Sequence, residues 1–315
     1  MRLFDSHCHL DDKSYQPDRE AVLRRAREAG VTGFMVVGIN PQTARKAIRI
    51  AETQPGVYAS VGIHPHDAAH CSEAVLEELI DLAEHDKVCA WGETGLDFNR
   101  MYSPRDVQEK WFERQLAIAA RLDLPLIFHE RDSNGRFLEM LKAAGTASLQ
   151  GVVHCFSGNR REMLAYLDLG LHIGITGIVT MKQRGRALRE LVPQIPDDRL
   201  LVETDAPYLA PTPFRGKRNE SAYIHQIADK LASIKEIELE ELARIVKHGG
   251  FCFITIQGIT ALSRLMQEEP SIWPSDSPEM LKDKGYIYHE YSDFKREKIQ
   301  EKILKLGSKY FGIRN

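Results

Sequence analysis

The chain has 315 residues, of which 43% are hydrophobic and 28% charged, a composition that fits a large folded domain and excludes a disordered chain. Its 42 basic and 45 acidic residues give a formal net charge of -3, which excludes the global positive field of many nucleic-acid-binding proteins. A local cationic rim or bound metal ions would still attract a nucleic-acid substrate.

Cysteine usage and the start of the chain indicate the compartment. The 5 cysteines form no C-x-x-C pair, and their odd number leaves one unpaired in any full disulfide scheme, so reduced thiols are expected. No signal-peptide pattern precedes Leu3–His7, and no apolar run reaches the about 18 residues that a membrane span needs. We expect a cytoplasmic protein without membrane contact, and we find no sign of an obligate protein partner.

Short apolar runs alternate along the chain with longer amphipathic segments. Most runs are nearly continuous in apolar residues rather than alternating, which is typical of parallel strands covered by helices. In chain order the expected strands are Leu3–His9, Gly33–Ile39, Val57–Ile63, Val88–Asp97, Pro125–Glu130, Gly151–Ser157, His172–Gly177 and Leu200–Asp205.

The amphipathic segments predict a helix after each strand. Eight strand–helix units predict a closed (β/α)8 TIM barrel of class α/β. An open doubly wound sheet is the alternative, weakened because no glycine-rich phosphate loop follows the first strand. The expected helices are Asp18–Ala29, Pro41–Thr53, Ser72–His85, Pro104–Leu122, Ser133–Ala144, Arg160–Leu169, Gln183–Leu191 and Glu220–Ala232.

The pattern ends before the last sixty or so residues. We therefore expect a single catalytic barrel domain over residues 1–255 and a C-terminal helical extension over residues 256–315. Within the extension, Phe294–Phe311 has the apolar spacing of an amphipathic helix. Such a helix packs on the barrel itself or docks a partner, and the role of the extension is open.

The first strand ends in Asp5-Ser6-His7-Cys8-His9. Residues two apart in a strand point to the same side, so His7 and His9 form a possible chelating pair. Taken alone, a His-x-His pair also fits two polar side chains that face solvent. The other strand ends change this interpretation, because each places a His, Glu or Asp where barrel enzymes keep catalytic groups. The residues concerned are Glu93, His129, His154 and Asp205.

These four histidines and two carboxylates would be costly to gather at one rim without cations. Nitrogen and oxygen ligands without a cysteine set suit Zn²⁺, Mn²⁺ or Mg²⁺ in an open catalytic site. Two divalent ions about 3.5–4 Å apart need a bridging group, for which Glu93 is the natural candidate, and they would activate a water molecule as nucleophile.

Several motifs with these residues resemble the TatD-type metal-dependent deoxyribonuclease family of the amidohydrolase-like barrels, over about residues 1–250. They occur in the family's order: Asp5-Ser6-His7-Cys8-His9, Val61-Gly62-Ile63-His64-Pro65-His66, Gly92-Glu93-Thr94-Gly95-Leu96-Asp97, His154-Cys155-Phe156-Ser157-Gly158, Glu203-Thr204-Asp205-Ala206-Pro207-Tyr208-Leu209 and Arg218-Asn219-Glu220.

The resemblance implies a role for each matching residue. Glu93 would bridge the ions, and Asp205 would also orient the nucleophilic water or take its proton. The implied metal ligands are His7, His9, Glu93, His129, His154 and Asp205. The implied contacts to substrate phosphate are His64, His66, Arg131 and Arg218, whose donors and charges suit a phosphodiester.

Three functions are open at this point. The resemblance favours a 3′-to-5′ exonuclease that hydrolyses single-stranded DNA. The second hypothesis is an amidohydrolase-like hydrolase of an ester, amide or lactone, including an aminoacyl-tRNA ester. The third is a non-catalytic binding barrel, which intact ligands at all positions disfavour. Aromatic residues in or near the rim loops either stack on bases or pack within the loops: Phe98, Tyr102, Tyr208 and Phe214.

Overall fold

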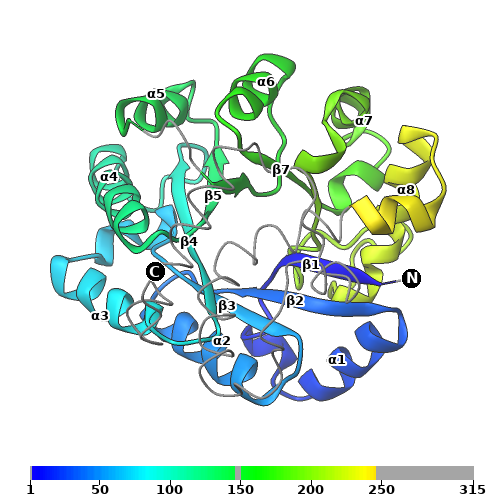
Figure 1. The fold of residues 1–315 in the computed structure, drawn as a ribbon, viewed down its shortest axis with the longest axis horizontal. Coiled ribbons are helices and arrows are strands. Elements are labelled where there is room, and N and C mark those ends of the chain that lie inside the picture. Colours follow the sequence, from blue (N-terminus) through cyan, green and yellow to red (C-terminus); the bar gives the residue numbers. More distant parts are fainter. Residues whose placement is uncertain (1, 146–149, 246–315) are drawn as a thin grey trace, which may run out of the picture. The chain divides into compact units, whose positions relative to one another are not determined.

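A computed structural model describes residues 2–145 and 150–245, in which eight parallel strands form one sheet in chain order (Figure 1). Each strand pairs with the next one along the chain. The strands are β1 (Leu3–Cys8), β2 (Val31–Val37), β3 (Val57–Val61), β4 (Val88–Asp97), β5 (Leu126–Arg131), β6 (Gly151–Val153), β7 (His172–Ile175) and β8 (Leu200–Val202).

The sheet closes where β1 meets the end of β8. The backbone N–H of His9 donates to the carbonyl of Ala206 over 2.7 Å, and that of Asp205 donates to the carbonyl of His7 over 2.9 Å. These bonds join the first and last strands, so the predicted (β/α)8 TIM barrel is confirmed and the open doubly wound sheet is excluded.

Helices surround the barrel and follow the strands in turn (Figure 1). In the second helix, Asn40 and Thr43 cap each other's backbone at the start, and Ala44, Ala47 and Ile48 are buried against the sheet. The helices are α1 (Arg19–Glu28), α2 (Pro41–Thr53), α3 (Glu73–Ala83), α4 (Arg105–Leu122), α5 (Arg136–Ala143), α6 (Arg160–Asp168), α7 (Arg186–Leu191) and α8 (Ile224–Lys235).

Both faces of the sheet are buried, which explains the nearly continuous apolar runs. Along β2, Val37 belongs to a small cluster with residues from other strands, including Phe4 and Ile127. Its neighbour Val36 belongs to the larger core that includes the buried residues of the helices. Neighbouring residues of one strand therefore fill different layers of the molecule.

Several predicted elements are shorter in the structure. β4 and α2 have the predicted bounds. β6 and β8 end at Val153 and Val202, and within the predicted ranges beyond them Cys155 and Asp205 adopt the left-handed backbone conformation, with φ of 48° and 56°. The helix predicted from Ser133 begins only at Arg136, after a turn in which φ is also positive. The predicted polar residues thus lie either within the strands, as His7, Glu93 and His129 do, or just beyond the strand ends, as His154 and Asp205 do.

Two predictions for the C-terminal part fall outside the described residues. These are the domain boundary at residue 255 and the amphipathic helix over Phe294–Phe311. Within residues 2–145 and 150–245, no helix combines the length and apolar character needed to cross a membrane.

Candidate metal centre

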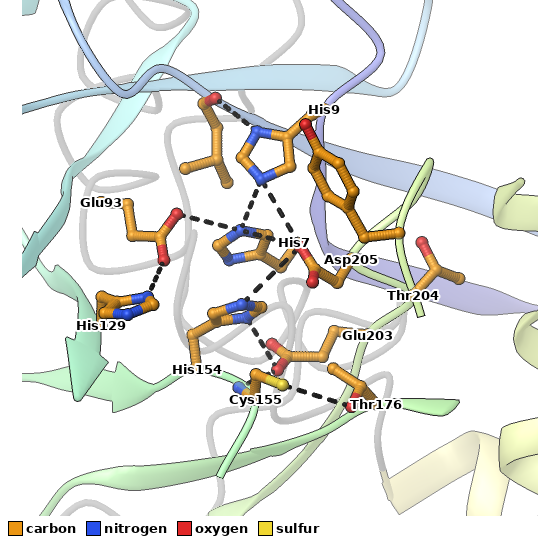
Figure 2. A network of polar contacts seen from close by, with 12 residues as sticks. His7, His9, Glu93, His129, His154, Cys155, Thr176, Glu203, Thr204 and Asp205 are labelled. Carbon is orange, nitrogen blue, oxygen red and sulfur yellow. Dashed lines mark hydrogen bonds and ion pairs between the residues drawn. The ribbon is translucent and has the colours of Figure 1, made fainter. Parts of the chain in front are cut away.

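The two histidines at the end of the first strand, His7 within it and His9 just after it, face each other at the barrel mouth (Figure 2). Nε2 of His7 lies 3.2 Å from Nε2 of His9. The His7 side chain is fully buried, and that of His9 is 12% exposed. Nδ1 of His9 lies 3.2 Å from the carbonyl oxygen of Val37, which orients the other ring nitrogen toward His7.

Glu93 on β4 lies between histidines of two different strands. Its Oε2 is 3.5 Å from Nε2 of His7, and its Oε1 is 2.9 Å from Nδ1 of His129 on β5. The carboxylate is almost completely buried, with 4% of the side chain exposed. One carboxylate therefore presents an oxygen to each side of the cluster, as a bridging ligand does.

Asp205 and His154 complete the cluster from the ends of β8 and β6 (Figure 2). Oδ1 of Asp205 lies 3.5 Å from Nε2 of His9 and 3.8 Å from Nε2 of His154. The rings of His7 and His154 stack with their centroids 3.4 Å apart. The structure thus brings all the sequence-predicted ligands to one mouth, although their strands are distant in the chain.

Two further carboxylates support the predicted ligands and were given no role by the sequence analysis. Oε1 of Glu203 lies 2.9 Å from Nδ1 of His154, and Oδ2 of Asp97 lies 3.1 Å from Nε2 of His129. Glu203 stands two positions before Asp205, and Asp97 stands four positions after Glu93. Even spacings along a strand direct side chains to one face, and this signal could have identified both carboxylates.

The predicted phosphate contacts occupy different depths. His64 is buried, with Nε2 3.1 Å from Nδ1 of His129 and 3.5 Å from Oε1 of Glu93, so it lies within the cluster itself. His66 lies farther out, with 31% of its side chain exposed and Nε2 2.7 Å from Asp97. Arg131, at the end of β5, is 40% exposed.

Arg218 lies in a different setting from the other predicted phosphate contacts. Its Nη1 and Nη2 donate to the two carboxylate oxygens of Asp18 over 2.8 and 2.7 Å. The guanidinium therefore already has an anionic partner, whereas the only ion pair of Arg131 within the described residues is a longer one of 3.9 Å, to Asp132.

The structure separates the four rim aromatics into two kinds. Tyr102 and Tyr208 are 65% and 53% exposed, and their rings contact those of His66 and His9 at centroid distances of 4.7 and 5.8 Å. Phe214 instead stacks on Tyr223, and Phe98 packs against the main hydrophobic core. Of these four aromatic residues, only the two tyrosines combine a largely exposed side chain with a ring contact to a histidine of the cluster.

The histidines and carboxylates of the cluster shift one another's pKa values. Burial would raise the pKa of Glu93 and Asp205, but the surrounding histidines outweigh it and hold both pKa values below their ordinary range. Burial would lower the pKa of His9 and His129, but the carboxylates that face them raise both pKa values to about 9. Protons on the histidines thus compensate the carboxylates, and a divalent cation would offer the same compensation.

The donor set fits a divalent cation. A ring nitrogen can share a proton with one neighbour at a time, whereas a cation at a shared point satisfies several lone pairs together. All donors in question are imidazole nitrogens or carboxylate oxygens, which suit Zn²⁺, Mn²⁺ and Mg²⁺. Three groups have ligand atoms within 4.8 Å of one another: His7, His9 and Glu93; His7, His154 and Asp205; and His64, His66 and His129.

Comparisons with known proteins agree with this arrangement. The family model of the TatD related DNases matches residues 4–249. A 3′-5′ ssDNA/RNA exonuclease TatD of Pantoea vagans is 43% identical over 246 residues, which are 76% of this chain and 95% of that protein. An uncharacterized metal-dependent hydrolase of Bacillus subtilis, YabD, is 39% identical over 77% of this chain and 95% of its own length.

A solved structure shares the fold. The crystal structure of YJJV, a TatD homologue from Escherichia coli, superposes with a TM-score of 0.76 at 31% identity and covers 81% of this chain and 98% of that chain. The family match spans the barrel and every residue of the cluster described above. The chain therefore belongs to the family of TatD related DNases.

Proposed function

We propose that this protein is a metal-dependent phosphodiesterase that removes mononucleotides from the 3′ end of single-stranded DNA. The observation that carries the proposal is the largely buried His/Asp/Glu cluster, at whose outer edge His66 and Arg131 are partly exposed. The exonuclease name of the Pantoea relative at 43% identity supports the same activity. The free thiols of Cys8, Cys71, Cys89 and Cys155 support a cytoplasmic location.

Two divalent ions, Mg²⁺, Mn²⁺ or Zn²⁺, are the cofactors in this proposal. Glu93 would be the shared ligand, since its two oxygens face His7 on one side and His129 on the other. When bound, the ions would lower the pKa of a water molecule and neutralise charge on the phosphodiester. The proposed ligands are His7, His9, Glu93, His129, His154 and Asp205.

Different residues of the chain would accept the proton of water and bind the phosphate. Asp205 would take the proton of the attacking water, because its carboxylate is held by His9 and is still 14% exposed at the mouth. Water oxygen bonds to phosphorus while the bond to the 3′ oxygen of the preceding nucleotide breaks. The departing 3′ oxygen takes up a proton from solvent, so the shortened strand ends in a 3′ hydroxyl, and a nucleoside 5′-monophosphate leaves. His66 and Arg131 would bind the phosphate oxygens, with His64 behind them.

The barrel mouth favours an unpaired strand end. The cluster is largely buried, so a nucleotide must leave any base stack to reach it, and a single-stranded end does so at the least cost. Access to the mouth in this way does not depend on base identity, which agrees with a sequence-tolerant exonuclease.

The test is digestion of a 5′-labelled single-stranded oligonucleotide with Mg²⁺ or Mn²⁺. A descending ladder with mononucleotide release supports the proposal, and an oligonucleotide with a blocked 3′ end should resist. Bis(4-nitrophenyl) phosphate and a 4-nitrophenyl ester serve as small substrates. Hydrolysis of the ester without cleavage of either phosphodiester would favour the hydrolase of esters, amides or lactones instead.

A further inference from the structure

Arg218 is bound on several sides by residues near the start of α1. The guanidinium of Arg218 makes two bonds to Asp18, and its Nη1 also donates to the carbonyl of Ser14 over 2.6 Å. The guanidinium also lies over the ring of Tyr15, 4.7 Å from its centroid. A bidentate carboxylate pair with a stacked ring is a strongly fixed arrangement for an arginine.

The next residue, Asn219, holds the segment that carries Asp205. Its Nδ2 donates to the carbonyls of Thr204 and Tyr208 over 2.9 and 2.6 Å, and its backbone N–H donates to the carbonyl of Pro207 over 3.0 Å. Asn219 is fully buried. A single side chain thus ties together both ends of the short loop around Asp205.

Tyr15 contacts both Arg218 and Asn219. Its hydroxyl donates to the carbonyl of Asn219, and its ring carries the guanidinium of Arg218. The following residue repeats the connection to α1, because Glu220 accepts from Nε of Arg25 over 2.8 Å. The sequence Arg218-Asn219-Glu220 therefore fastens the Asp205 loop to α1 and the turn before it, about 200 residues away in the chain.

We infer that Arg218 positions Asp205, acting through Asp18, Tyr15 and Asn219, and does not bind the substrate phosphate. Its guanidinium has its anionic partner within the protein, and the residues that it orders lead directly to the Asp205 loop. The inference rests on the proposed function only in the role given to Asp205. It makes Arg218 a positioning residue, and it makes Asp18 its functional partner.

Three variants separate this role from phosphate binding: Asp18→Asn, Arg218→Gln and the charge exchange Asp18→Arg with Arg218→Asp. Steady-state cleavage of single-stranded DNA at several salt concentrations gives kcat, KM and the salt dependence. Titration of chelator-treated protein with Mn²⁺ alone, followed by calorimetry, gives a reading that needs no substrate. Arg24→Gln, which breaks an exposed pair with Glu28 on α1, is the matched control.

A positioning role predicts that the two single variants behave alike. Each should lower kcat about tenfold, because a small displacement of a catalytic group is costly, and each should weaken Mn²⁺ binding. KM and the salt dependence should stay within about twofold of the wild type. The charge exchange should recover part of both losses, because it restores the ion pair but not the bond to Ser14 or the contact with Tyr15.

A phosphate contact predicts a different pattern. Arg218→Gln would then raise KM and reduce the salt slope by about one, while Asp18→Asn would leave kcat intact and free the arginine for substrate. That pattern would overturn the inference. If circular dichroism shows that the charge-exchange variant does not fold, the comparison of the two single variants still distinguishes positioning from phosphate binding. Wild-type protein that leaves DNA intact would refute the proposed function, and the Mn²⁺ titrations would still test the positioning.

Discussion

Oδ2 of Asp97 lies 3.1 Å from Nε2 of His129, on the opposite side of the ring from the carboxylate of Glu93. A carboxylate in this place accepts the Nε2 proton and leaves Nδ1 as the atom with a free lone pair. Asp97 is itself held by the backbone N–H groups of Asn99 and Arg100, so its position is fixed by its own loop. The relationship selects which nitrogen of His129 faces the cluster.

Asp97→Asn is therefore expected to weaken metal binding. The amide can present its N–H to the ring and stabilise the wrong tautomer, and loss of such an outer partner typically costs about 10–100-fold in metal affinity. Calorimetric titration of the chelator-treated variant with Mn²⁺ measures the change. Asp106→Asn, an exposed position in the first turn of α4, is the control and should bind like the wild type. Equal affinities in all three proteins would exclude this role for Asp97.

Asp205→Asn is expected to lower hydrolysis at least about a hundredfold while the barrel stays folded. The side chains have the same shape, but the amide cannot take a proton from water. Single-turnover cleavage of labelled single-stranded DNA measures the rate, and circular dichroism checks the fold. Unchanged turnover would place the chemistry elsewhere.

The two exposed tyrosines are expected to bind bases. Tyr102→Ala and Tyr208→Ala should each raise KM for single-stranded DNA about tenfold, because stacking contributes about 1–3 kcal/mol per base. The same variants should hydrolyse bis(4-nitrophenyl) phosphate, which has no base, at the wild-type rate. Phe214→Ala is the comparison, since its ring packs on Tyr223 and should affect stability rather than KM. A uniform loss on both substrates would contradict base stacking.

A histidine outside the metal centre predicts a pH dependence of stability. Burial, followed by the charge of Arg199, lowers the pKa of His172 at the start of β7 to about 4, whereas an unfolded histidine titrates near 6.5. Between these values only the unfolded chain takes up the proton. The stabilisation from neutral His172 is thus complete above pH 6.5 and is lost as the pH falls toward 4.

His172→Gln should reduce this acid sensitivity. The free energy of unfolding, measured in urea at pH 7 and pH 5, should fall by about 2 kcal/mol less in the variant than in the wild type. An identical fall in both proteins would show that His172 does not titrate differently on folding.

The sequence predicted most of this molecule because its information is local. The apolar run of β4 and the capping residues of α2 specify those elements without reference to the rest of the chain. The same holds for the predicted ligands, since a barrel collects the ends of all its strands at one mouth. The predicted strands ran past the ends of β6 and β8 into Cys155 and Asp205, whose left-handed conformation has no signature in residue type.

Relationships between distant segments could not be predicted in this way. Nothing near Arg218 in the sequence indicates that Asp18 is its partner, and both phosphate binding and ion pairing suit an exposed arginine. The same limit applies to Tyr208 and Phe214, which lie in one loop region and differ only in what packs against them.

We propose above that the histidines and carboxylates at the barrel mouth bind divalent cations together. Metal analysis of the purified protein, combined with Mn²⁺ titration after chelation, tests it most directly. We expect about two ions per chain and loss of both in Glu93→Gln, because that carboxylate faces both sides of the cluster. Glu139→Gln, an exposed position on α5, should retain both. Wild-type protein that binds no divalent cation, or a Glu93→Gln variant that binds as the wild type does, would contradict the account.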